Sequence, residues 1–179
     1  MRVGQMRVIA GEFRSRRLKS IPGDATRPTP DRLRETLFNI LAPRIAGATF
    51  LDAYAGTGAI GIEALSRGAR HAWFLEKNRA ALEAIRENLA SLQLERRASV
   101  VAGPVIPALE GYTADIVFLD PPYPLEQEYA AALELLARHP PPLTIVQHGS
   151  RFLLPEAQGA LSRTRLLKQG DNALSFYEP

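Results

Sequence analysis

The sequence predicts an α/β fold with a seven-stranded, mostly parallel sheet that ends in a C-terminal antiparallel strand, preceded by a small β-hairpin and helix. Three observations support this prediction. From about residue 48, short apolar runs alternate with amphipathic helical patterns, as in sheets covered by helices on both faces. After Pro155 the alternation stops, and two strand-like runs flank a turn at residues 169–172. Before residue 48, a glycine-centred turn separates two short segments, and one helical pattern follows.

Length and composition limit the class of protein. The chain has 179 residues, of which 46% are hydrophobic, so it can form one domain with a buried core. It contains no cysteine, which excludes disulfides and thiolate chemistry. No apolar run approaches 18 residues, and the N-terminus lacks the apolar stretch of a secretion signal. We therefore expect a cytoplasmic protein without a membrane span.

Charge is distributed unevenly along the chain. Residues 1–44 hold ten Lys and Arg against four Asp and Glu, whereas the remainder is mildly acidic. A solvated N-terminal arm would explain this, but a footprint for a phosphate backbone explains it better. We therefore divide the chain into a basic hairpin and helix over residues 1–47, which would contact nucleic acid, and a main domain over residues 48–179.

The expected elements follow in order along the chain. Residues 6–10 and 13–19 flank Gly11-Glu12, which predicts a hairpin with arginines on one face. A proline-rich loop at residues 27–31 leads into a helix over residues 31–42, where Pro30 suits the first turn. The strands are expected at residues 48–52, 71–76, 98–102, 114–119, 143–147, 161–167 and 173–177, with the clearest helix at residues 79–92.

The first predicted strand leads into a glycine loop. Gly56-Thr57-Gly58-Ala59-Ile60-Gly61 matches G-x-G-x-x-G after a strand and before a helix, which is the context of a dinucleotide site. However, Asp52 ends the strand, with three residues between it and the first glycine. Its carboxylate suits a ligand with a cationic amino acid group and would repel a pyrophosphate. The loop therefore favours S-adenosylmethionine over NAD.

A second carboxylate, Glu76, ends the next strand eighteen residues beyond Gly58. At that place it can accept both hydroxyls of a ribose, which either cofactor would provide. The third strand leads into Gly103-Pro104, where adenine contacts would come from backbone groups because no carboxylate or amide is present. The cofactor-binding residues expected from these three strand ends are Asp52, Ala55, Gly56, Thr57, Gly58, Glu76, Lys77 and Gly103.

The fourth strand ends directly in Asp120-Pro121-Pro122-Tyr123. An exocyclic base amine is a poor nucleophile because its lone pair is delocalised into the ring. Hydrogen bonds from the amine to the Asp120 carboxylate and the Pro121 carbonyl would favour a pyramidal nitrogen, and Asp120 would stabilise the developing cation. Tyr123 offers a face on which the base can stack. We therefore expect these four residues to be catalytic, against the alternative of a simple acidic turn.

These motifs resemble the class I, Rossmann-like methyltransferases of the amino-N type. The front of the chain resembles the RsmD family more narrowly, in Met6-Arg-Val-Ile-Ala-Gly-Glu-Phe-Arg-Ser-Arg-Arg-Leu18 and Arg27-Pro-Thr-Pro-Asp-Arg-Leu-Arg-Glu-Thr-Leu-Phe-Asn-Ile-Leu41. That family contains bacterial 16S rRNA guanine-N2 methyltransferases, so the resemblance implies guanine 966 of small-subunit rRNA, presented on an assembling particle. The residues then expected to bind RNA are Arg7, Arg14, Arg16, Arg17 and Lys19.

The chain departs from the family pattern at two places. The family usually has an aspartate where Gly103 or Pro104 stands, and a glutamate where this chain has Gln147-His148. The first departure bears on adenine recognition.

Other functions remain open at this stage. The same chemistry on adenine N6 of DNA generally needs a separate target-recognition region, and protein-glutamine enzymes usually carry Asn where Asp120 stands. An NAD-dependent reductase would give Asp120 no role, and a non-catalytic RNA-binding module would not need the intact carboxylates. The three histidines are not at metal-ligand spacing. We expect a monomer that uses S-adenosylmethionine and no metal.

Overall fold

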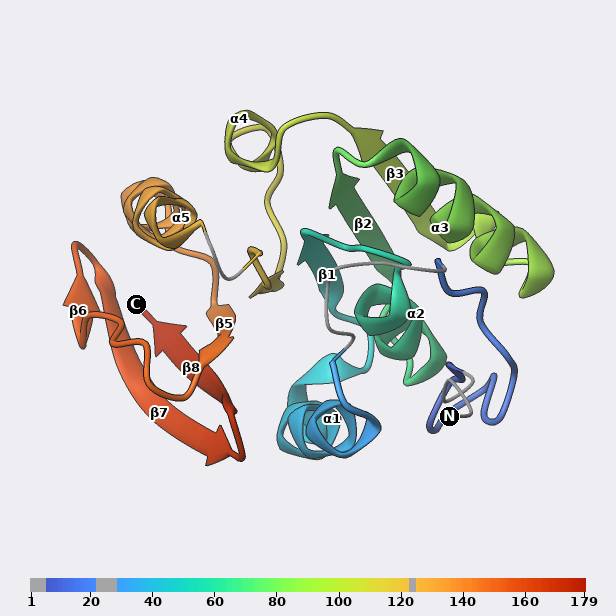
Figure 1. The fold of residues 1–179 in the computed structure, drawn as a ribbon, viewed down its shortest axis with the longest axis horizontal. Helices are drawn as coiled ribbons and strands as arrows, with labels where there is room; N and C mark the ends of the chain where they lie inside the picture. Colours follow the sequence, from blue (N-terminus) through green and yellow to red (C-terminus); the bar gives the residue numbers. More distant parts are fainter. Residues whose placement is uncertain (1–5, 22–28, 123–124) are drawn as a thin grey trace.

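The computed structural model describes residues 6–21, 29–122 and 125–179, and it contains one eight-stranded sheet (Figure 1). The strand order is β3-β2-β1-β4-β5-β8-β7-β6. The first five pair in parallel and the last three in antiparallel fashion, which confirms the predicted α/β, Rossmann-like class. The strands are β1 (Thr49–Ala53), β2 (His71–Glu76), β3 (Ala98–Ala102), β4 (Ile116–Leu119), β5 (Leu143–Gly149), β6 (Ala157–Gln158), β7 (Leu161–Gln169) and β8 (Asn172–Glu178).

The prediction of seven strands was wrong by one. The additional strand, β6, contains two residues and pairs only with the start of β7. Two residues are too few to show the alternation by which a strand is identified in a sequence. Among the described residues, the antiparallel part of the sheet therefore contains three strands.

Helices cover both faces of the sheet (Figure 1). One face carries α1 (Asp31–Ile45), α2 (Ala59–Ser66) and α3 (Arg79–Ser91); the other carries α4 (Val105–Leu109) and α5 (Glu126–Arg138). A short 3-10 helix, η1 (Glu95–Arg97), precedes β3. No helix in the described ranges is long and apolar enough to cross a membrane. The two layers create two apolar clusters, one on each side of the sheet.

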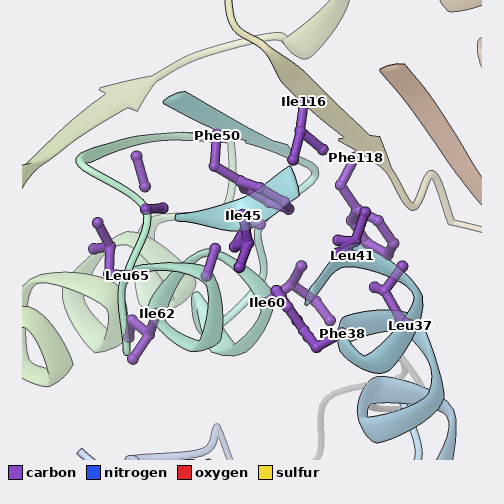
Figure 2. Close-up of a cluster of buried hydrophobic side chains, with 14 of the residues drawn as sticks. Leu37, Phe38, Leu41, Ile45, Phe50, Ile60, Ile62, Leu65, Ile116 and Phe118 are labelled. Carbon is purple, nitrogen blue, oxygen red and sulfur yellow. The ribbon is translucent and has the colours of Figure 1, made fainter. Parts of the chain in front are cut away.

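The N-terminal helix is part of the main core. Leu37, Phe38 and Leu41 of α1 belong to the same buried cluster as Phe118 of the sheet (Figure 2). Burying an aliphatic or aromatic side chain of this size contributes about 1.5–3 kcal/mol. The helix ends at Ile45 rather than at residue 42 because Ile45 is buried in this cluster, and Pro43 is accommodated in the last turn. Residues on both sides of position 47 therefore share one hydrophobic cluster.

The predicted N-terminal hairpin is irregular. Its only described strand-like pair is a single bridge between Arg7 and Arg17. Backbone hydrogen bonds join Val8 with Ser15 and Arg16, and Leu18 with Met6, but the two N–H groups after Val8 turn to α2 instead. The Glu63 carboxylate accepts hydrogen bonds from the N–H groups of Ile9 and Ala10, at 2.8 and 3.0 Å. We call residues 6–21, which run along α2 and α3 in this way, the basic arm.

The turn of the basic arm lies directly against α2. Gly11 has a φ of +86°, and a Cβ atom built on it would lie 2.0 Å from the carbonyl oxygen of Ser66. Ser66 also accepts the Phe13 N–H through its Oγ, at 3.0 Å. Only glycine permits both the backbone conformation and this approach.

Candidate active site and nucleic-acid interface

The predicted catalytic and cofactor residues meet at the carboxyl ends of neighbouring parallel strands. In the sheet, Ala53 of β1 pairs with Leu75 of β2 and with Leu119 of β4. The next residues of β2 and β4 are Glu76 and Asp120, so these two carboxylates flank the glycine loop that follows β1. This edge, where strand ends meet at a change in winding direction, is where ligands bind in open α/β sheets.

The glycine loop has an unusual backbone over a short distance. Tyr54, Gly56 and Gly58 all have positive φ, at 64°, 56° and 82°. Gly58 then opens α2, and Gly61 in its first turn lies so close to Phe74 that a Cβ atom would be 2.3 Å from the ring. The glycines thus allow a tight strand-to-helix turn packed directly on β2.

Asp52 stabilises this turn from within. It is 1% exposed, and its Oδ2 accepts the Gly61 N–H at 2.8 Å. Burial raises the pKa of Asp52 well above its usual range; the Gly61 N–H opposes the shift, and the charges of Asp120 and Glu76 add to it. One oxygen of the Asp52 carboxylate therefore binds the backbone at the start of α2. A cationic ligand group beside the carboxylate would favour its ionised form.

Glu76 is held in place by three backbone donors. Its Oε2 accepts the Gly56 N–H at 2.9 Å, and its Oε1 accepts the N–H groups of Lys77 and Asn78 at 2.9 and 2.8 Å. The Gly103 N–H donates to the backbone carbonyl of Glu76 at 3.0 Å. Gly56, Glu76 and Gly103 therefore lie together, and no other atom lies within 4 Å of a Cβ built on Gly56 or Gly103. The space beside these glycines is open to a ligand.

Asp120 continues β4 next to β1, and its backbone N–H donates to the Ala53 carbonyl at 3.4 Å. Burial raises the pKa of its carboxyl group to about 7. The carbonyl of Pro121, which follows it, accepts a hydrogen bond from the Tyr129 hydroxyl of α5 at 3.3 Å. A carbonyl oxygen has two lone pairs, so Pro121 can still accept a second donor. Tyr123, the last residue of the predicted catalytic group, lies outside the described residues.

Sequence reasoning did not find several polar contacts around this site. The Tyr54 hydroxyl donates to Glu128 of α5, and burial raises the pKa of that tyrosine. Gln147, at the end of β5, accepts the Thr29 hydroxyl at 3.0 Å. Its neighbour His148 is bonded instead to Ser175 of β8, at 2.9 Å. These pairs are separated by tens of residues in the sequence, so no local pattern predicts them.

A buried asparagine joins the glycine loop to the basic arm. Asn88 of α3 is 2% exposed; its Nδ2 donates to the Thr57 carbonyl at 3.0 Å, and its Oδ1 accepts the Lys19 N–H at 2.6 Å. The Thr57 hydroxyl also lies 3.3 Å from the sulfur of Met6. The arm and the loop are therefore fixed relative to each other.

The five cations predicted to bind RNA fall into two groups. The side chains of Arg7, Arg14 and Arg17 are exposed and form no ion pair or hydrogen bond with any described residue. By contrast, Arg16 donates to the Ser91 carbonyl at 2.9 Å, and Lys19 pairs with Glu87 of α3 at 2.6 Å. The first three are thus available to an external anion.

The backbone below these cations is rigidly attached. Glu63 is completely buried, and besides the two arm N–H groups its carboxylate accepts Arg67 at 2.8 Å. Arg34 of α1, also buried, donates to the Arg7 carbonyl at 2.7 Å. A cavity of about 270 Å³ lies between the arm and α1, lined by Arg7, Val8, Ile9, Arg14, Ser15, Asp31 and Glu35.

The fold is that of a Rossmann-like methyltransferase. The chain matches the model of the family described as conserved hypothetical protein 95 over residues 6–178. It belongs to this family, the RsmD family of methyltransferases. It is 35% identical to YlbH of Bacillus subtilis, over 97% of this chain and 98% of that protein.

Two further similarities agree with this assignment. The chain is 45% identical to ribosomal RNA small subunit methyltransferase D of Escherichia coli over 121 residues, 67% of this chain and 61% of that one. The structure of yhhF from Escherichia coli superposes with a TM-score of 0.86 at 37% identity, covering 98% of both chains.

Proposed function

We propose that this protein transfers the methyl group of S-adenosylmethionine to the exocyclic N2 of a guanine in 16S rRNA, namely guanine 966. The observation that carries the proposal is the position of Asp120-Pro121 beside the glycine loop, at the carboxyl end of β4. The relative from Escherichia coli is named as a methyltransferase of small-subunit ribosomal RNA, which supports the substrate class. The exposed arginines of the basic arm supply the charge that an RNA backbone needs.

The residues of the glycine loop fit the proposed cofactor. Glu76 presents a carboxylate fixed by backbone N–H groups, which suits the two hydroxyls of a ribose. Open space beside Gly56 and Gly103 leaves room for a ligand close to the backbone. Asp52 supplies negative charge below the loop, where a cationic amino acid group would be favoured. The cofactor itself supplies an activated methyl group on a positively charged sulfur.

Asp120 has two tasks in the proposed reaction. As a carboxylate it accepts an N–H of the target amine, which directs the nitrogen lone pair away from the carboxylate and toward the methyl group. The nitrogen forms a bond to the methyl carbon as the carbon–sulfur bond breaks, and a positive charge develops on nitrogen beside Asp120. The Pro121 carbonyl accepts the second N–H. Because Asp120 has a pKa of about 7, it can also take up the proton that the methylated amine releases.

Positioning provides much of the remaining catalysis, since the methyl donor is already activated. The bonds of Asp52 to Gly61 and of Glu76 to Gly56 fix the shape of the loop. We further propose that the protein acts in the cytoplasm, on an assembling small-subunit particle, as a monomer and without a metal.

The test is to identify the methylated nucleotide. Purified protein is incubated with labelled S-adenosylmethionine and either small-subunit particles that lack the modification or deproteinised 16S rRNA. We expect label in N2-methylguanosine at position 966, with more label on the particles. Label in N6-methyladenosine or in a protein would retain the methyl transfer but refute the target.

Calorimetry tests the cofactor separately. We expect S-adenosylmethionine to bind and NADH not to bind, and Glu76→Gln to weaken cofactor binding by about tenfold, the effect of losing roughly one good hydrogen bond to a charged group. Binding of NADH alone would refute the proposed chemistry.

A further inference from the structure

The side of the site that receives the target base follows from the order of the strands. The proposed cofactor residues follow β1 and β2, and β4 separates these strands from β5. Asp120 therefore has the cofactor loop on one side and the end of β5 on the other. A base whose amine contacts Asp120 must approach from the β5 side, because the β1 side is occupied by the glycine loop.

Gln147 stands at that position. Leu119 of β4 pairs with Val146 of β5, so the residues that follow, Asp120 and Gln147, lie side by side on neighbouring strands. Strands in a sheet are about 4.8 Å apart, and residues in register point to the same face. The nearest preceding pair on that face is Phe118 and Ile145, and both pack in the cluster beneath α1.

Gln147 is a buried amide with a partner from the other end of the chain. It is 2% exposed, and its Oε1 accepts the hydroxyl of Thr29 at 3.0 Å. Thr29 lies two residues before the start of α1, and 118 positions separate the two residues. A buried amide that lost this partner would carry a desolvation cost, so the bond is a specific link.

The segment that Thr29 begins is otherwise rigid. The Pro30 carbonyl accepts the Arg34 N–H at 3.0 Å, and the Arg34 side chain bonds both Asp31 and the Arg7 carbonyl, at 3.0 and 2.7 Å. Residues 29–31 are therefore fixed at one end by α1 and at the other by Gln147. Through the Thr29–Gln147 bond they form a wall at the end of β5, the strand next to Asp120 on the side away from the cofactor loop.

We infer that Thr29, held by Gln147, is a positioning residue for the target base at Asp120. The inference rests on the proposed function, because it assigns a role in the methyl transfer proposed above. Thr29 orients the wall against which the base is placed, and neither Thr29 nor Gln147 takes part in proton transfer. Loss of the bond should slow methyl transfer without changing cofactor affinity, because the cofactor residues lie across β4.

The test compares hydroxyl variants at two threonines, Thr29 just before α1 and Thr36 within it. Thr29→Val removes the hydroxyl and keeps the shape, whereas Thr29→Ser keeps the hydroxyl. Thr36→Val is the matched control, since its hydroxyl bonds only the Arg32 carbonyl within α1, at 2.9 Å. Single-turnover rates are measured with rRNA and cofactor saturating, together with the cofactor dissociation constant and the melting temperature.

We expect Thr29→Val to lower the single-turnover rate constant about tenfold, since a small misplacement of reacting groups can cost up to about 100-fold. Thr29→Ser should recover the rate to within about twofold, and Thr36→Val should retain it. Gln147→Met should match Thr29→Val, and the double variant should be no slower than either single variant, as for two partners of one contact.

Several results would overturn the inference while leaving the proposed function intact. These are an unchanged rate in Thr29→Val, a Thr29→Ser variant as slow as Thr29→Val, or rate losses that multiply in the double variant. A rate loss in Gln147→Met but not in either Thr29 variant would also overturn it. If wild-type protein transfers no methyl group to rRNA, the proposed function fails, and the inference fails with it.

Discussion

The strand-end site and the basic arm use charge in opposite ways. At the site, Asp52 and Asp120 are carboxylates whose pKa values are raised by burial. On the arm, Arg7, Arg14 and Arg17 are exposed and held by no described partner, while the backbone beneath them is fixed by the buried Glu63. At the site, burial therefore disfavours the ionised form of the carboxylates for which chemistry is proposed. On the arm, the arginine charges are solvated and the backbone that carries them is bound to α2.

This difference separates two kinds of contribution. Buried groups at a strand end can act differently on a transition state and a ground state, so they affect the rate. Solvated cations on a surface attract any polyanion and act mainly on affinity and its dependence on salt. If the two regions differ in this way, variants at the site should change the rate of methyl transfer, and variants on the arm should change RNA affinity.

The largest expected effect is on catalysis. Asp120→Ala should lower the rate of methyl transfer by about 100- to 1000-fold, the usual cost of removing a group that stabilises developing charge. The dissociation constants for cofactor and RNA should stay within about twofold of wild type, as measured by calorimetry and filter binding.

Asp115→Ala is the matched control for that variant. Asp115 precedes the same strand at its opposite end and accepts the Thr49 N–H and hydroxyl, at 2.7 and 2.8 Å. Its loss should lower the melting temperature yet preserve the rate. If both variants lost the rate equally, general damage to β4 and not the position of Asp120 would explain the effect.

The next effect is on RNA affinity. Replacing Arg7, Arg14 and Arg17 together by Gln should weaken RNA binding by roughly 10- to 100-fold near 0.1 M salt. The slope of log K against log salt should decrease in magnitude by about 2, the value for three lost phosphate contacts. The matched control replaces Arg138, Arg165 and Lys168, which are exposed on α5 and β7. An equal loss in the control would show that net charge alone matters.

The smallest effect is on stability and its pH dependence. The folded-state pKa of Asp120 is raised to about 7 from an ordinary value of 3.8, so the folded protein binds a proton that the unfolded chain has released in this interval. The folded protein therefore loses stability as pH rises from 3.8 toward about 7, and the loss is complete above about pH 7. Asp120→Asn should raise the melting temperature at pH 8 by roughly 2–4 °C, and not at pH 3.

The same variant sharpens the proposed mechanism. Because the reaction needs the ionised carboxylate, the wild-type rate should rise with pH and level off above a midpoint near 7. In Asp120→Asn the lower rate should not follow that curve. A wild-type rate that is independent of pH between 5 and 9 would contradict the role given to the carboxylate.

Much of the central fold was predictable because it depends on local patterns. The bounds of β2 and β3 were predicted to the residue, and α3 to within one residue, since apolar runs and helical periodicity mark them. The two-residue β6 carries too little pattern to be identified. The hairpin pairing of the arm does not extend beyond Val8 because Glu63, more than fifty positions away, accepts the N–H groups of Ile9 and Ala10.

The candidate site was also predictable only where local motifs determine it. The glycine loop, Glu76 and Asp120 could be placed together because parallel strands bring their carboxyl ends to one edge. The contacts of Asn88 with the arm, of Tyr54 with Glu128 and of Thr29 with Gln147 join distant segments through polar side chains. A single sequence contains no signal for such contacts.

The single-turnover rate at saturating RNA tests the division of work most directly. It is measured for wild type, for Asp120→Ala and for the triple Arg7, Arg14 and Arg17 variant, at RNA concentrations well above each dissociation constant. We predict that the arm variant reaches the wild-type rate once RNA saturates it, while Asp120→Ala binds RNA normally and stays at least about 100-fold slower. An arm variant that remains slow at saturation, or an Asp120→Ala variant that recovers, would contradict the account.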